Sequence, residues 1–115
     1  MAKLPNHENA YIEAAKIRDY VLSSSHQVGR FKAAVFKVLG YSQDEWERLA
    51  EDIRLYHLNM DAEPAGDTRY GRKYSIVGEI KGPNGKTMLF KSLWIVLAGD
   101  DVPRFITIYP VGGDR

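Results

Sequence analysis

Apolar residues in the first half of the chain recur every three or four positions. This is the period of a helix that buries one face against a core. The clearest stripe begins at Phe31, with apolar residues at i, i+3, i+4, i+7 and i+8, and Gly40 supplies a stop signal after it. Ser42 and Glu45 have the spacing of a capping box, in which two residues satisfy each other's free amides at a helix start. The predicted helices cover about Glu13 to Leu22, Gly29 to Leu39 and Ser42 to His57.

The apolar period changes from helical spacing to alternation in the second half of the chain. Residues Asn59 to Asp67 include Pro64 and Gly66 and are predicted to form a loop. Alternating residues beyond them predict three strands, and Asn84-Gly85 between two apolar runs is a strong hairpin signal. The predicted strands are Tyr70 to Lys81, Lys86 to Leu97 and Val102 to Tyr109.

The order of these elements indicates the fold class. Because helices and strands are segregated along the chain, we expect an α+β fold. Three N-terminal helices should pack on one face of a three-stranded antiparallel β-meander, with a four-stranded sheet as the alternative. Residues 1–115 are expected to form a single domain, because 115 residues is a typical size for one domain.

Charge and composition narrow the classes of function. The chain has 16 Lys and Arg residues against 15 Asp and Glu residues, so its net charge of +1 creates no global attraction to nucleic acid. It has no cysteine, which excludes disulfides, thiolate nucleophiles and cysteine-ligated zinc. No apolar run approaches the roughly 18 residues of a membrane span, and the N-terminus has no apolar signal core. We therefore expect a soluble, cytoplasmic protein with no membrane partner.

Metal, cofactor and nucleophile motifs do not stand out in the sequence. The histidines His7, His26 and His57 are scattered, and no pair has the i, i+4 spacing of a helical metal site. The stretch from Gly82 to Lys86 lies between two predicted strands, so it lacks the strand-to-helix context of a phosphate-binding loop. No Gly-x-Ser-x-Gly elbow is present. We expect neither a metal nor a cofactor.

The last predicted strand combines a guanidinium, a hydroxyl and a phenol. Alternation places Thr107 and Tyr109 on the same face as Phe105, with Arg104 on the opposite face. Such groups suit metal-free phosphate chemistry. Cleavage of RNA needs one group to take the 2′-hydroxyl proton and another to protonate the leaving oxygen, while cations or hydroxyls hold the anionic phosphorane.

Cationic residues at the start of the second predicted helix could meet this strand across a groove. Arg30 and Lys32 lie in the first turn, and His26 precedes them closely. A helix N-terminus favours an anion, because its free amides and its dipole both attract negative charge. Both cations also have an ordinary interpretation as solvated helix residues.

Residues of the first two predicted strands could line the same groove. Lys73 lies near the start of the first strand, and Ser92 and Trp94 share one face of the second. Trp94 is a candidate for stacking a nucleobase, with a core residue as the structural alternative.

Short motifs spread along the chain carry a resemblance to a known family. The chain resembles a short uncharacterised domain that recurs in cyanobacteria and other bacteria, and the resemblance covers nearly its whole length. Gln27 stands where the family pattern has Pro. The matching motifs are Leu4 to Ala10, Lys16 to Leu22, His26 to Ala33, Tyr70 to Tyr74, Gly82 to Gly85, Trp94-Ile95 and Pro103 to Pro110.

That domain is similar in turn to toxin domains of the barnase–EndoU–colicin–RelE superfamily. Those domains place helices before a small antiparallel sheet and cleave RNA without metal. The resemblance implies a site at Lys32, Arg104, Thr107 and Tyr109, with His26 as a candidate acid or base. It also implies a small antitoxin or immunity protein as partner.

Two functions are compatible with these residues. The first is a metal-independent endoribonuclease of the toxin type, in which Lys32 and Arg104 bind the scissile phosphate. His26 or Tyr109 would transfer protons and Thr107 would hydrogen-bond the phosphate. The alternative is a non-catalytic protein-binding module, such as a toxin–antitoxin or immunity-like partner, which the near-neutral charge favours because RNA binding usually needs a basic footprint. Substrate binding is assigned to Arg30, Lys73, Ser92 and Trp94.

Overall fold

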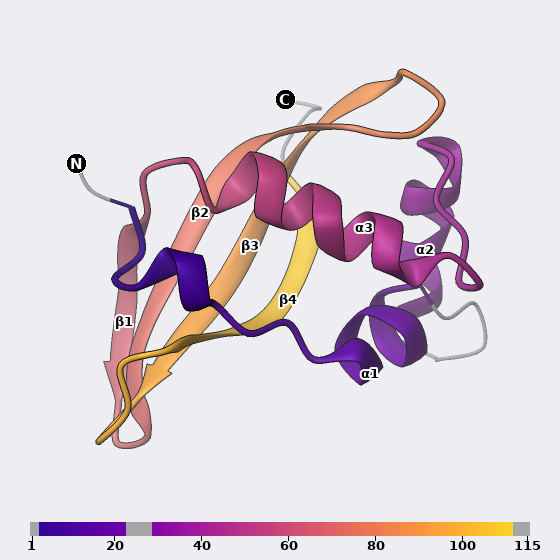
Figure 1. Ribbon diagram of the computed structural model, residues 1–115. Helices are drawn as coiled ribbons and strands as arrows, with labels where there is room; N and C mark the ends of the chain where they lie inside the picture. The colour runs from indigo at the N-terminus through magenta and orange to yellow at the C-terminus, as the bar shows by residue number, and fades with distance from the viewer. Residues whose placement is uncertain (1–2, 23–28, 112–115) are drawn as a thin grey trace.

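All helical segments of the computed structural model precede its strands (Figure 1). The structure describes residues 3–22 and 29–111, and no helix within those residues is long and apolar enough to cross a membrane. The helical segments are α1 (Ala14–Lys16), α2 (Gly29–Val38) and α3 (Trp46–Asp52), the 3₁₀ turn η1 (His7–Asn9), and the π-helical turns η2 (Ile17–Val21) and η3 (Ile53–His57). The strands are β1 (Glu63–Thr68), β2 (Gly71–Lys81), β3 (Thr87–Leu97) and β4 (Pro103–Pro110).

The strands form one antiparallel sheet in the order β1-β2-β3-β4, so each strand pairs with its neighbour in the sequence. β2 and β3 pair along their whole length, from Gly71 opposite Leu97 to Lys81 opposite Thr87. Gly85 in the turn between them has a φ of 88°, a left-handed conformation that glycine adopts without strain. The long central hairpin therefore sets the register for the two outer strands.

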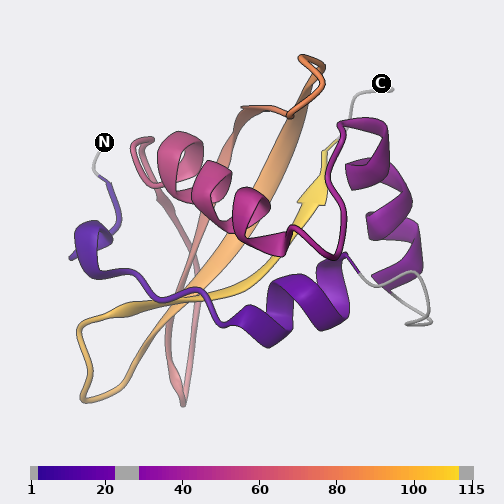
Figure 2. The same ribbon diagram turned by 45° about the vertical axis from the view of Figure 1, so that its right-hand side comes forward.

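One face of the sheet carries the core and is covered by the helical segments (Figures 1 and 2). α3 and η3 cross the strands, and α2 lies beside β4. Phe36 of α2 stacks on Phe90 of β3 with ring centroids 4.8 Å apart, and Trp94 meets Phe105 edge to face at 5.4 Å. All four side chains are at most 2% exposed. Because each such burial is worth roughly 1.5–3 kcal/mol, these aromatic pairs fix which face of the sheet is covered.

The turn between β2 and β3 also holds the end of α2. The side-chain amide of Asn84 donates to the carbonyl of Val38 at 2.6 Å, and its backbone N–H donates to the carbonyl of Leu39 at 3.2 Å. Gly82 passes so close to Leu39 that a Cβ at this position would meet the Leu39 carbonyl oxygen. Glycine is therefore required here by the close approach of two backbones.

A buried histidine joins η3 to two strands. Nε2 of His57 lies 3.0 Å from the carbonyl oxygen of Gly78, and because a carbonyl only accepts, Nε2 carries the proton. Nδ1 then accepts from the hydroxyl of Ser92 at 2.7 Å, and the indole N–H of Trp94 donates to the same hydroxyl at 2.9 Å. His57 is 0% exposed, and burial lowers its pKa, opposed by the hydrogen bond to Gly78. The imidazole is therefore a neutral core group.

The expectation of three N-terminal helices followed by a three-stranded meander is wrong. The first predicted helix is a three-residue α-helix continued by the π-helical turn η2, and the third ends in η3. α3 begins at Trp46, and its N-cap residue Glu45 makes no side-chain hydrogen bond, so the predicted capping box does not form. Helix propensity is a weak determinant, and packing against a twisted sheet overrides it in such short segments.

The fourth strand, β1, lies in the stretch predicted to be a loop. Pro64 and Gly66 are the loop signals, and the pairing of β1 with β2 is irregular between these two residues. β1 is at the edge of the sheet, where a proline without an amide hydrogen is tolerated. Gly66 has a φ of 110°, which suits an irregular position in a strand. The loop prediction fails because neither residue prevents an edge strand.

Candidate functional site

A β-bulge in β4 determines which side chains share a face of the sheet. Leu93 of β3 pairs with Thr107, whereas the next residue, Trp94, pairs with Phe105. Ile106 is therefore an extra residue on β4. As a result, Phe105 and Ile108 are both in the core, at 2% and 0% exposure.

The bulge brings together the three polar residues of β4. Arg104, Thr107 and Tyr109 pair with Ile95, Leu93 and Lys91, which alternate with the buried residues of β3. All three therefore lie on the face opposite the core. The expectation that Phe105 shares a face with Thr107 and Tyr109, apart from Arg104, is wrong because simple alternation breaks at the bulge.

The face of the sheet opposite the core is arranged in rows across β2, β3 and β4. We call it the open sheet face, and the helical segments α1, α3 and η3 lie on the other side of the sheet (Figures 1 and 2). Each row contains one residue of β2, one of β3 and one of β4. The rows are Lys73–Ile95–Arg104, Ser75–Leu93–Thr107 and Val77–Lys91–Tyr109. The face also includes Glu63, Glu79, Lys81 and Leu89.

The open sheet face combines aliphatic and cationic side chains. Val77 is 50% exposed and Leu89 is 40% exposed, although both are apolar. Leu93 and Ile95 are half-buried between the strands that flank them. Exposed apolar side chains that cluster on one surface mark sites of interaction more often than scattered ones do.

Arg104 is held at one margin of this face. Its guanidinium lies 3.5 Å from the Asp100 carboxylate and 5.8 Å from the centre of the Tyr11 ring. Tyr11 continues the sheet beside β4, because its N–H donates to the Pro103 carbonyl at 2.8 Å and its backbone bridges to Arg104. Asp100 is fixed in turn, since its carboxylate accepts the backbone N–H of Val102 and that of its neighbour, which lowers its pKa.

Two of the predicted substrate-binding residues lie in the core. Ser92 and Trp94 are both 0% exposed and belong to the hydrogen-bond network of His57. A fully buried indole offers no face on which a base can stack. Lys73, in contrast, lies on the open sheet face, in the same row as Arg104.

Arg30 and Lys32 belong to the first turns of α2, and their side chains, like the whole of His26, lie outside what the structure describes. α2 packs against the covered face through Phe36 and also touches β4.

Lys91 and Tyr11 are site residues that the sequence analysis missed. Lys91 lies opposite Tyr109, and Val77 lies opposite Lys91 on the other side. Its position was available from the sequence, because alternation places Lys91 on the face opposite Ser92 and Trp94. The pairing of Tyr11 with β4 could not be predicted from neighbouring residues, because it joins segments from the two ends of the chain.

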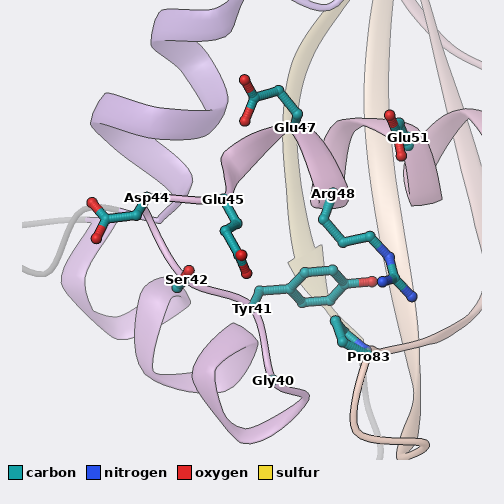
Figure 3. Close-up of a pocket in the computed structure, with 9 residues that line it drawn as sticks. All are labelled: Gly40, Tyr41, Ser42, Asp44, Glu45, Glu47, Arg48, Glu51 and Pro83. Atoms are coloured by element: carbon teal, nitrogen blue, oxygen red, sulfur yellow. The ribbon is translucent and has the colours of Figure 1, made fainter.

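A pocket on the covered side of the molecule is lined by acidic side chains (Figure 3). It has a volume of about 300 Å³ and lies between the start of α3 and Pro83. The Tyr41 hydroxyl donates to the buried carboxylate of Asp52 at 2.5 Å, and Arg48 lies 3.3 Å from the same carboxylate. Burial, and then this hydrogen bond, raise the pKa of Tyr41. These contacts anchor α3 to the chain that precedes it.

Within residues 3–22 and 29–111, no three His, Cys, Asp or Glu side chains are grouped so that they could hold a metal ion. The chemistry of the open sheet face therefore rests on its cations, its hydroxyls and its aliphatic surface.

The fold and the open sheet face define a small α+β protein with a four-stranded antiparallel sheet that the described helices cover on one side. The chain belongs to the family described as Domain of unknown function (DUF6883), which matches residues 3–112. No curated protein matches the sequence. Its structure is similar to a chain of the contact-dependent growth inhibition toxin–immunity protein complex from Klebsiella pneumoniae 342. The TM-score is 0.61 at 23% identity, over 93% of this chain and 97% of that one.

Proposed function

We propose that this protein is one component of a toxin–immunity pair and that it binds its partner protein through the open sheet face. The observation that carries the proposal is the likeness of nearly the whole chain to a chain from a toxin–immunity protein complex, at a TM-score of 0.61. Proteins with the same fold often differ in function. The proposal therefore also depends on whether the open sheet face has the properties of a protein-binding surface.

The open sheet face has the properties of a protein-binding surface. Its centre is aliphatic, with Leu93 and Ile95 half-buried and Val77 half exposed to solvent. Its margins carry charged side chains such as Lys73 and Arg104. An apolar centre with a polar rim is the usual anatomy of an interface between proteins.

The experiment measures a complex with the protein that the neighbouring gene encodes. Size-exclusion chromatography should show a stable complex, and calorimetric titration should give its affinity. We expect Val77→Asp and Leu89→Asp to weaken binding at least about tenfold, because each puts a charge in the apolar part of the interface. Leu55→Asp is the matched control, since Leu55 is 59% exposed on η3, away from this face. Absence of a complex, or equal weakening by all three variants, would contradict the proposal.

Metal-independent cleavage of RNA is a second candidate, and it is compatible with the first because a toxin can be the component that its immunity protein binds. The observation in its favour is the bulge, which puts Arg104, Thr107 and Tyr109 on one face beside Lys91. A cation, a hydroxyl and a phenol at neighbouring positions can neutralise a phosphate and transfer protons.

The test for this activity is incubation of tRNA and other RNAs with the protein in the presence of EDTA. Cleavage by the wild type should fall at least about a hundredfold in Arg104→Ala and in Lys32→Ala, as expected for loss of a group that stabilises the transition state. Arg54→Ala removes an exposed cation from η3 and should leave the rate unchanged. If the wild type cleaves none of these RNAs, the ribonuclease hypothesis is refuted.

A further inference from the structure

The charged side chains of the chain are unevenly distributed between the two sides of the sheet. The formal net charge of the whole chain is only +1. On the open sheet face and its margin, four cations stand against three carboxylates, which is a small local excess of positive charge. The cations are Lys73, Lys81, Lys91 and Arg104, and the carboxylates are Glu63, Glu79 and Asp100, the last of which is paired with Arg104.

A pocket on the covered side of the molecule is acidic. The pocket at the start of α3 is lined by four carboxylates and a single cation, Arg48, which is already paired with Asp52 (Figure 3). The carboxylates belong to Asp44, Glu45, Glu47 and Glu51. A partner of negative charge is therefore attracted to one side of this protein and repelled from the other, which orients the encounter.

The cations of the open sheet face surround its aliphatic centre. Lys73 and Arg104 stand at the two ends of one row with Ile95 between them, so their Cα atoms are about 10 Å apart across two strand spacings. Lys91 is the middle residue of a row that lies four residues from Ile95 along β3, about 13 Å away, and Leu93 lies between the two. Three cations at the corners of an apolar patch suit a partner that presents several carboxylates around an apolar side chain.

The chemistry between the cations favours a protein over a nucleic acid. A single-stranded nucleic acid is usually held by aromatic side chains on which its bases stack. Here the positions between the cations are taken by Leu93 and Ile95. The aromatic residues lie at the margin, with Tyr109 beside Lys91 and Tyr11 beside Arg104, and Trp94 is buried on the other face. Branched aliphatic side chains pack well against other apolar side chains and offer no flat surface for a base.

We propose that the partner of this protein is an acidic protein, whose Asp and Glu side chains meet Lys73, Lys91 and Arg104 around an apolar contact with Val77 and Ile95. This inference rests on the proposed function, because it names the chemistry of the partner that the open sheet face binds. Arg104 is held in place for this role by Asp100 and by the ring of Tyr11.

The test is a charge-reversal series against the protein encoded by the neighbouring gene. Lys91→Glu and Arg104→Glu should each weaken the complex at least about tenfold at physiological salt, mostly through slower association in the case of the exposed Arg104. Arg54→Glu is the matched control, because it makes the same change in net charge at an exposed position on η3. The association rate of the wild type should also fall as salt is raised.

Three outcomes decide the matter. Selective weakening by Lys91→Glu and Arg104→Glu, together with the salt dependence, supports the inference. A complex that forms but is insensitive to both substitutions and to salt overturns it, while the proposed function stands. Absence of any complex overturns both. As a second probe, an oligouridylate that binds with the same variant pattern, in the absence of a protein complex, overturns the inference in favour of RNA.

Discussion

Protonation of the buried His57 should destabilise the protein below neutral pH. In the folded state the imidazole is 0% exposed, its Nε2 proton is donated to Gly78 and its Nδ1 is occupied by the hydroxyl of Ser92. A second proton on Nδ1 would remove the acceptor of the buried Ser92 hydroxyl proton, because the Ser92 oxygen would then have to accept from both His57 and Trp94. The folded state therefore resists protonation, and burial lowers the pKa of His57 from its ordinary value of 6.5.

The sign and size of the effect follow from linkage. Because the unfolded chain takes up the proton near pH 6.5 and the folded chain does so only at lower pH, the unfolded state binds more protons in this window. The free energy of unfolding is therefore undiminished above pH 6.5 and falls as the pH decreases. If His57 stays neutral when folded, the loss between pH 7.5 and pH 5.5 is about 1.4 kcal/mol. With a urea dependence of about 2 kcal/mol per molar, the unfolding midpoint falls by about 0.7 M.

The assay is urea unfolding from pH 8 to pH 5, followed by tryptophan fluorescence because Trp94 is buried. His57→Gln removes the titrating group. The variant should be less stable than the wild type at neutral pH, but its free energy of unfolding should fall by about 1.4 kcal/mol less than that of the wild type between pH 7.5 and pH 5.5. His7→Gln is the control for loss of a histidine outside the core, because the His7 side chain is 27% exposed beside Glu8 whereas His57 is fully buried. Equal slopes in the wild type and in His57→Gln would refute the reasoning.

Three further substitutions and one control substitution test the packing of the covered face by urea unfolding. Phe36→Ala should lower the free energy of unfolding by about 3–5 kcal/mol because its ring is fully buried, whereas Val38→Ala, at a 52% exposed position of the same helix, should change it by less than about 0.5 kcal/mol. Gly82→Ala should cost about 1–3 kcal/mol, since its Cβ would meet the backbone of Leu39. Tyr41→Phe should cost about 1–3 kcal/mol and should remove the loss of stability expected above pH 10, where the unfolded phenol ionises before the folded one. The reasoning fails for Phe36→Ala, Gly82→Ala or Tyr41→Phe if that variant unfolds at the same urea concentration as the wild type, and it fails for the helix if Val38→Ala is destabilised as much as Phe36→Ala.

The central hairpin could be predicted from the sequence because its signals are local. β2 begins one residue after its predicted start at Tyr70, and β3 and β4 each lie within one residue of prediction at both ends. The alternation of apolar residues and the turn at Asn84-Gly85 were enough to predict the bounds of these strands, because both signals act between residues close in the chain. The second helix was also predicted within one residue at both ends, as Gly29 to Leu39 against the observed Gly29–Val38. The first and third helices were predicted less well, because the lengths of such short segments are set by contact with the sheet rather than by the periodicity of their own residues.

The arrangement of the candidate site depends on the β-bulge in β4, which the alternation of residues does not predict. The extra residue Ile106 shifts the parity of β4, so that Arg104 joins Thr107 and Tyr109 on one face. A bulge is stabilised by packing on both faces of the sheet, which no pattern within a single strand records. Trp94 takes the core position that the sequence analysis kept as an alternative. Its indole N–H donates to Ser92 of its own strand, and the Ser92 hydroxyl donates to His57 of the distant turn η3, a contact without a local signal in the sequence.

The most direct test of the open sheet face as the partner-binding surface uses the absence of cysteine from the chain. Val77→Cys places one thiol on the open sheet face, and Leu55→Cys places one at a similarly exposed position on η3. The rate of thiol alkylation is measured for each variant, free and in complex with the protein encoded by the neighbouring gene. We expect the complex to slow alkylation at position 77 at least about tenfold, and to leave position 55 unchanged. Protection at position 55 with full reactivity at position 77 would place the partner on the helical side and contradict the account.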